Sequence, residues 1–283
     1  MLLTGKKTII VEGGGFKTSF SAGVLDAFRI TNFDDFDAFL AVSGGSLAVS
    51  YFLGNQFGSY INSMKQLCKD PRFIQISKTF SDGLMNLDFF IEVAEKEFPF
   101  DLEKAVEATQ SKDFYIVLTE TDSGQTSYLK PNRENWVEMT IAASTVPLIT
   151  KGKHYLDGIA YSDGGISDPI PIQWAVENGA TDILLIRTTH ANFKPSYIRP
   201  EYVAAKLLKA SPELKSHVGN FQQKIKDSID YIDSIDKSVN LHQILPEKPL
   251  NSNIITNSVN SIILDYRHGL ELGLNYVMAN RKK

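Results

Sequence analysis

The strongest constraint on the fold of this chain is a pattern of strand, glycine turn and helix that occurs twice near its start. A short β-type run at residues 7–11 leads into three consecutive glycines at 13–15, and an amphipathic segment follows at 19–28. A second apolar run at 37–42 is broken by Ser-Gly-Gly at 43–45 and continues into another helical segment. Two such units in succession favour parallel strands that are joined by helices.

The middle of the chain continues this alternation. Strands are predicted at residues 114–119 and 182–188, with a helix at 172–178 that ends at Gly179. The predicted fold is therefore a three-layer α/β/α domain with a mostly parallel sheet. We place this α/β domain at residues 5–190.

The texture changes after His190, where charged amphipathic patterns replace the short strands. The elements predicted there are helices at 201–209 and 213–235, a strand at 241–245 and a closing helix at 258–277. We interpret residues 191–283 as a mainly helical C-terminal extension that packs on the α/β domain.

Composition narrows the classes of function. The chain has 283 residues and a net charge of −4, which argues against a nucleic-acid partner because phosphate binding needs a basic face. Cys68 is the single cysteine, so neither an internal disulfide nor a cysteine-rich zinc site is expected. No spacing of His, Cys or carboxylate residues resembles a ligand set, so we expect no metal and no cofactor.

The chain shows no apolar run long enough for a membrane-spanning helix. Near the start, the apolar run at residues 8–11 is also too brief for the core of a signal peptide. We therefore expect a cytoplasmic protein whose contact with a membrane or micelle is peripheral.

Ser43 lies in the sequence Ala41-Val42-Ser43-Gly44-Gly45, between a predicted strand and a predicted helix. A nucleophile elbow of the pattern G-x-S-x-G holds a serine hydroxyl clear of the backbone on such a turn, and small flanking residues permit it. Ala41 stands where the pattern has its first glycine. A turn that only caps the following helix is the alternative for this pattern taken alone.

The glycine loop Gly13-Gly14-Gly15-Phe16-Lys17 ends the first strand and precedes a helix. Its backbone amides can point toward an anion, as an oxyanion hole requires. The sequence matches neither of two common nucleotide-binding motifs. A P-loop needs glycine immediately before its lysine, and a dinucleotide fingerprint needs glycine where this chain has Thr18. A flexible glycine turn without further function is the remaining alternative.

Asp163 begins a third motif, Asp163-Gly164-Gly165, on a sharp turn. A strand pair at 153–155 and 159–161, joined by a tight turn at 157–158, is predicted to deliver the chain to it. An Asp-Gly-Gly turn is common by itself. Its weight comes from the order of glycine loop, serine elbow and aspartate turn within one α/β pattern.

In these three motifs the chain resembles the patatin-like phospholipases, whose signature is a G-G-G-x-[KR]-G loop, a G-x-S-x-G elbow and a D-G-[GA] turn. The resemblance covers residues 7–188, and the stretch at 161–171 looks like bacterial members. It implies that Ser43 is the nucleophile, that Asp163 is the base in a Ser-Asp dyad, and that the amides of Gly13 to Lys17 are oxyanion donors. Ala41 and Thr18 depart from the signature and put the catalytic rate in question.

The resemblance further implies a lipid acyl hydrolase of the phospholipase A or lysophospholipase type, acting on phospholipid or another acyl lipid through an acyl-Ser43 intermediate. Two alternatives stay open. One is a Ser-His-Asp esterase, for which His190 is the rival base because it follows a predicted strand. The other is a catalytically silent lipid-binding protein. A phenylalanine-rich stretch at residues 73–100 is interpreted mainly as core, with an acyl pocket as a second use.

Overall fold

The computed structural model describes residues 1–75, 84–147, 149–195 and 211–281. Its eight-stranded sheet has the order β5-β6-β3-β2-β1-β7-β8, and β4 pairs with β3 beside this path. The strands are β1 (Lys7–Val11), β2 (Ala38–Val42), β3 (Asp113–Glu120), β4 (Thr126–Leu129), β5 (His154–Leu156), β6 (Ile159–Asp163), β7 (Asp182–Ile186) and β8 (Asn240–Ile244).

The central strands are parallel, since β1 pairs in parallel with β2 and β7, β2 with β3, and β7 with β8. The strands β4, β5 and β6 form the antiparallel edge. The prediction of a mostly parallel sheet is therefore confirmed. The carboxyl ends of β1, β2 and β7 meet at one edge, where an open α/β sheet binds its ligands.

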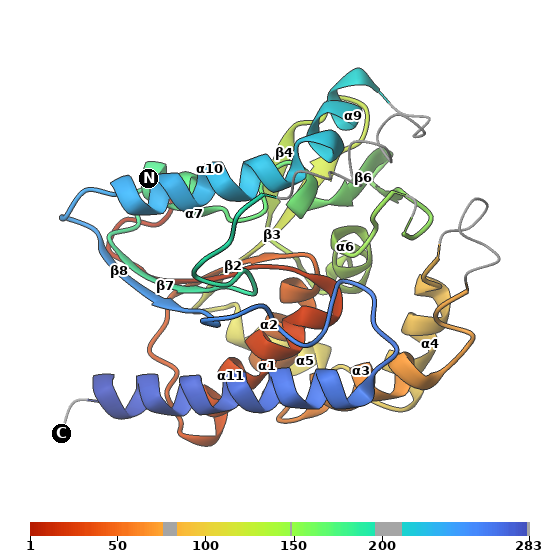
Figure 1. Cartoon of the computed structure of the whole chain (residues 1–283), viewed down its shortest axis with the longest axis horizontal. Helices are drawn as coiled ribbons and strands as arrows, with labels where there is room; N and C mark the ends of the chain where they lie inside the picture. Colours follow the sequence, from red (N-terminus) through yellow and green to blue (C-terminus); the bar gives the residue numbers. More distant parts are fainter. Residues whose placement is uncertain (76–83, 148, 196–210, 282–283) are drawn as a thin grey trace.

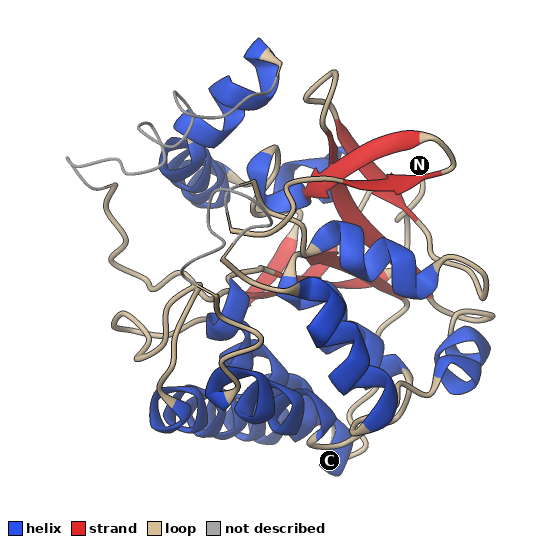
Figure 2. Ribbon diagram, turned by 90° about the vertical axis from the view of Figure 1, so that its right-hand side faces the viewer, coloured by secondary structure: helices blue, strands red, loops and turns tan. Residues whose placement is uncertain are grey.

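Helices cover both faces of the sheet (Figures 1 and 2). The described helices are η1 (Gly15–Thr18), α1 (Ser19–Ile30), α2 (Gly44–Leu53), α3 (Ser59–Lys69), α4 (Leu87–Lys96), α5 (Leu102–Ala108), α6 (Trp136–Ala143), η3 (Gly164–Ile166), α7 (Ile172–Glu177), α9 (Pro212–Gly219), α10 (Phe221–Ser234) and α11 (Val259–Asn280). The predicted three-layer α/β/α fold is confirmed.

Alternation along the strands fills two cores, one on each face. Ile9 and Val11 of β1 belong to the core that includes α1, α2 and α11, whereas Ile10 belongs to the core that includes α7 and α10. Strands that are buried on both faces read as continuous apolar runs, which explains the sequence of β1 and β2. The serine elbow and the glycine loop thus follow directly from strands that are buried on both faces.

The C-terminal residues are integrated into this architecture. β8 adds a parallel strand to β7, and α11 lies along α1 (Figure 1). The two helices approach closely, because a Cβ at Gly23 would collide with the carbonyl oxygen of Tyr266 and one at Gly269 with that of Phe20. The division of the chain at residue 190 stays a prediction.

Two sequence predictions need comment. The single helix predicted at 213–235 is wrong, because Gly219 ends α9 and Asn220, with φ −107° and ψ 13°, separates it from α10. A glycine followed by an asparagine has low helix propensity and favours such a break. The helix predicted at 201–209 lies outside the described residues. The tight turn before β6 is confirmed, with positive φ at Asp157 (49°) and Gly158 (82°).

Candidate active site

Ser43 lies on a strained turn between β2 and α2. Its φ of 54° and ψ of −133° are unusual for a residue with a side chain, and such values persist only where the surroundings enforce them. One neighbour has no room for a side chain, since a Cβ at Gly45 would lie 2.8 Å from the carbonyl oxygen of Val11. Ala41 is completely buried within β2, so its methyl group fits the core at the position of the usual glycine.

The glycine loop lies directly against this turn. A Cβ at Gly13 would be 2.6 Å from Cβ of Ser43, so only glycine permits this approach. Gly14 and Gly15 adopt φ values of 141° and 58°, which favour glycine. The departure at Thr18 is accommodated, because this residue is fully buried beneath Gly44.

The amides of the loop divide into two groups. Phe16 N donates to the carbonyl oxygen of Ile254 at 3.3 Å, and Lys17 N donates to that of Gly14 at 3.2 Å. Within the described chain, the amides of Gly13, Gly14 and Gly15 have no hydrogen-bond acceptor. An oxyanion hole needs backbone donors without another acceptor, so these three amides are the ones available to an oxyanion.

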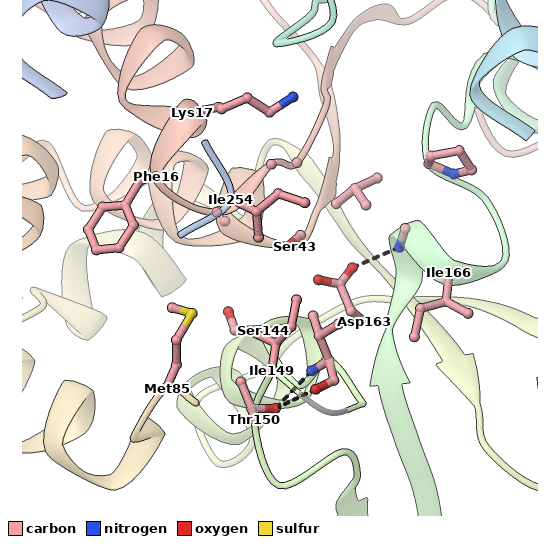
Figure 3. A pocket seen from close by; sticks show the side chains of 18 of the residues that line it. Phe16, Lys17, Ser43, Met85, Ser144, Ile149, Thr150, Asp163, Ile166 and Ile254 are labelled. Carbon is pink, nitrogen blue, oxygen red and sulfur yellow. Dashed lines mark hydrogen bonds between the residues drawn. The ribbon is translucent and has the colours of Figure 1, made fainter. Parts of the chain in front are cut away.

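Asp163 ends β6 and faces Ser43 across the cavity (Figure 3). Burial raises the pKa of the Asp163 carboxyl to about 7, although the Ser43 hydroxyl and the Gly165 amide both lower it. Gly165 N donates to Oδ1 of Asp163 at 2.8 Å. The following residue must be glycine, since a Cβ at Gly164 would collide with the carbonyl oxygen of Val117 in β3. A carboxyl with a pKa near neutrality suits a general base.

A cavity of about 550 Å³ opens above these residues. Its wall is mostly apolar and is built by several distant segments of the chain: the glycine loop and the elbow, Tyr60 and Met64 of α3, Phe73, Met85, Leu87 and Phe90, Val146, Pro147, Ile149 and Thr150, Ile166 and Pro169, and Val218, Phe221, Gln222, Ile225 and Ile254. Figure 3 shows Phe16, Met85 and Ile149 around the opening beside Ser43 and Asp163. The predicted acyl-pocket use of Phe73 and Phe90 is consistent with this lining.

His190 does not line the cavity. Burial lowers the pKa of its imidazole, and the positive charges of Lys17 and Arg187 lower it further. Its Nδ1 is buried without a hydrogen-bond partner, and the carboxylate of Asp163 interacts with Ser43 and Gly165 instead. No histidine is among the described residues that line the cavity.

Four supporting residues escaped sequence reasoning. Thr188 Oγ1 donates to the carbonyl oxygen of Gly13 at 2.6 Å, and Thr119 Oγ1 donates to that of Asp163 at 2.8 Å. Glu12 is buried and accepts the amide of Thr188 at 2.8 Å. Lys224 Nζ of α10 donates to the carbonyl oxygen of Ser167 at 2.7 Å, on the turn that carries Asp163. The positions of Thr119 and Thr188 near the carboxyl ends of β3 and β7 were the available signal.

Fold and site define the class of this protein: an α/β protein whose sheet edge carries a serine on a strained turn, a buried carboxylate and a glycine loop beside an apolar cavity. The sequence profile of the patatin-like phospholipases matches residues 9–176, and the chain belongs to this family of lipid acyl hydrolases. The family resemblance inferred from the motifs is confirmed. A second profile, a domain of unknown function called DUF6363, matches residues 211–282.

Two similar proteins extend this comparison. The chain is 29% identical over 282 residues to the "Uncharacterized protein YjjU" of Escherichia coli (strain K12), covering 97% of this chain and 78% of that protein. The crystal structure of VipD from Legionella pneumophila is similar at 11% identity with a TM-score of 0.48, covering 97% of this chain and 67% of that one.

The described part of the chain offers neither a cluster of metal ligands nor a membrane-spanning helix. Among the described residues, no group of three or more His, Cys, Asp or Glu side chains could hold a metal ion. The helices in the described part of the chain are too short or too polar to cross a membrane.

Proposed function

We propose that this protein is a serine carboxylic-ester hydrolase of the phospholipase A or lysophospholipase type, with Ser43 as nucleophile and Asp163 as base. One observation carries the proposal. A serine held at positive φ faces a buried aspartate whose pKa is raised to about 7 by burial, at the base of an apolar cavity. An ionised carboxylate in a dry site is a stronger base than one in water.

The chemistry follows from these positions. Asp163 accepts the proton of the Ser43 hydroxyl as Oγ attacks the ester carbonyl, and the developing oxyanion receives hydrogen bonds from the loop amides of Gly13 to Gly15. The tetrahedral intermediate then collapses. The alcohol leaves with the proton from Asp163, and the acyl group stays on Ser43. Water then attacks the acyl ester as Asp163 accepts one of its protons. Asp163 returns that proton to Ser43 Oγ when the bond between Oγ and the acyl carbon breaks, and the fatty acid is released.

The cavity favours a lipid substrate. Apolar side chains dominate its wall, and its volume of about 550 Å³ lies within the usual range for small-molecule sites. An acyl chain can be buried there while the polar part of the lipid stays toward solvent. The protein then meets its substrate at the surface of a membrane or micelle, by peripheral contact.

Labelling with a fluorophosphonate tests this proposal most directly. We expect a covalent adduct that peptide mapping places on Ser43, together with release of fatty acid from dispersed lysophospholipid that is undiminished by a chelator. Folded protein without labelling at Ser43 would favour a silent lipid-binding protein. Activity that is lost in chelator and restored by a divalent ion would show that the mechanism is wrong.

A further inference from the structure

The segment that precedes α11 lies against the glycine loop. The carbonyl oxygen of Ile254 accepts a hydrogen bond from Phe16 N at 3.3 Å, and a Cβ at Gly15 would collide with the same oxygen. The side chain of Ile254 also lines the cavity, near Ser43 (Figure 3). A residue from the C-terminal part of the chain therefore contacts the glycine loop, which lies against Ser43.

A buried carboxylate holds this segment in place. Asp265, on α11, is completely buried. Its Oδ1 accepts hydrogen bonds from Asn251 N at 2.8 Å and Asn251 Nδ2 at 2.9 Å. Its Oδ2 accepts one from Ser252 N at 2.8 Å and another from the Ser252 hydroxyl. Charge-assisted hydrogen bonds of this kind fix the backbone of two successive residues just before Ile254.

The anchor is itself rigidly placed. The close approach of α11 to α1 at Gly269 and Gly23 fixes the height of Asp265 relative to α1. Helix α1 in turn continues directly from η1, in which Gly15 and Phe16 lie. The loop is therefore held at two points. Thr188 Oγ1 donates to the carbonyl oxygen of Gly13, and the carbonyl oxygen of Ile254 contacts Gly15 and Phe16.

We propose that Asp265 is a positioning residue for the oxyanion loop, and that the region matched by the DUF6363 profile completes the active site of the patatin-like domain. The inference rests on the proposed function. Asp265 acts through Asn251, Ser252 and Ile254, and it touches no reacting atom. Its contribution is to keep Gly14 and Gly15 at positive φ, with their amides directed at the developing oxyanion.

The test compares Asp265→Asn with wild type in lysophospholipid hydrolysis and in the rate at which a fluorophosphonate modifies Ser43. We expect kcat and the labelling rate to fall about 10- to 100-fold, because a small displacement of oxyanion donors is costly. KM should stay within about threefold, since the acyl chain binds mainly elsewhere in the cavity.

A matched control comes from the same pair of helices. Asp26 of α1 is also a buried carboxylate, and it accepts the hydroxyl of Tyr266, the residue after Asp265, at 2.7 Å. Asp26→Asn alters the packing of α1 on α11 without touching the segment before Ile254. It should leave kcat and the labelling rate near wild type, so a general loosening of the two helices is distinguished from loss of the anchor.

Each outcome decides. If Asp265→Asn is folded and keeps wild-type kcat, or if Asp26→Asn loses as much, the inference is overturned while the proposed function stands. If Asp265→Asn does not fold, Asn251→Ala combined with Ser252→Ala replaces it, and full kcat in that variant overturns the inference equally. If wild-type protein neither labels nor hydrolyses, the proposed function falls and this inference falls with it.

Discussion

Two buried aspartates, Asp163 in the wall of the cavity and Asp265 on α11, differ in one respect of their surroundings. Within the described residues, the side chain of Asp163 accepts one backbone hydrogen bond, from Gly165, and faces the Ser43 hydroxyl. The side chain of Asp265 accepts four hydrogen bonds, from Asn251 and Ser252. Both carboxylates are removed from water, but only one is fully paired.

The difference shows how one protein uses the same side chain in two ways. A carboxylate that accepts hydrogen bonds from several donors is held in one position and can anchor the backbone that donates them. A carboxylate that is buried with few donors keeps a high affinity for a proton, which is why burial raises the pKa of Asp163 to about 7. We therefore assign reactivity to the incompletely paired aspartate and positioning to the other.

The largest expected effect is the loss of turnover when either member of the proposed Ser43–Asp163 dyad is replaced. Ser43→Ala and Asp163→Asn should each lower kcat about 10⁴-fold or more, because each removes a member of the reacting pair. The double variant should be scarcely worse than either single one, since residues that act as a unit are not additive. Steady-state hydrolysis of a lysophospholipid, with folding checked by circular dichroism, measures this.

His190→Gln is the control for that experiment. We expect it to keep most of the activity, because the imidazole does not line the cavity. If His190→Gln is folded but inactive, the mechanism is a Ser-His-Asp triad and not a dyad. Asp163 would then only orient the histidine.

The second effect tests the glycine loop. Gly14→Ala should lower kcat about 10²- to 10³-fold, which is typical for loss of one oxyanion donor. The new methyl group would lie 2.9 Å from Thr188 Oγ1, at a φ of 141° that disfavours alanine. Gly158→Ala is the matched control, because its φ is 82° and its Cβ would meet nothing within 4 Å. Equal losses in both variants would mean that backbone strain alone is responsible.

The third effect concerns pH. Asp163 must be ionised to accept the Ser43 proton, so kcat/KM should rise with pH through the raised pKa of about 7 and level off above it. Two pH units below that value, kcat/KM should be about 100-fold lower. In the wild-type protein, burial also raises the pKa of the Asp26 carboxyl, to about 6. The midpoint of the pH profile should nevertheless be unchanged in Asp26→Asn, which lacks this carboxyl. If the midpoint shifts in Asp26→Asn, the titration belongs to Asp26 and its assignment to Asp163 is wrong.

The sequence motifs predicted Ser43, Asp163 and the glycine loop as site residues, whereas nothing in the sequence pointed to Asp265. Ser43, Asp163 and Gly13 to Gly15 lie on short local motifs, where one turn geometry dictates the residue types. Asp265 is separated from the loop by most of the chain, and no local pattern links a helical aspartate to Asn251 and Ser252. Only the packing of α11 on α1 brings them together. The break at Asn220 was missed for a similar reason, because the apolar period continues through it.

The smallest effect concerns stability, because replacing the two aspartates by asparagine should change the free energy of unfolding in opposite directions. The folded-state pKa of Asp163, about 7, lies above its usual value of 3.8, so the folded protein binds this proton more tightly than the unfolded chain does. The resulting stabilisation is complete below about pH 4 and is lost as the pH rises through 7. At pH 8 wild type therefore carries an ionised, poorly paired carboxylate at a cost in stability.

Asp163→Asn removes that cost, so at pH 8 it should raise the free energy of unfolding by on the order of 1–3 kcal/mol, a gain that should vanish near pH 4. Asp265→Asn should lower it by a similar amount, because the amide turns a donor toward donors that the carboxylate satisfied. Urea unfolding of both variants at pH 4 and pH 8 measures the two changes. If Asp163→Asn is destabilised at pH 8 as Asp265→Asn is, then Asp163 is an anchor as well, and the division between a reactive and a positioning aspartate is wrong.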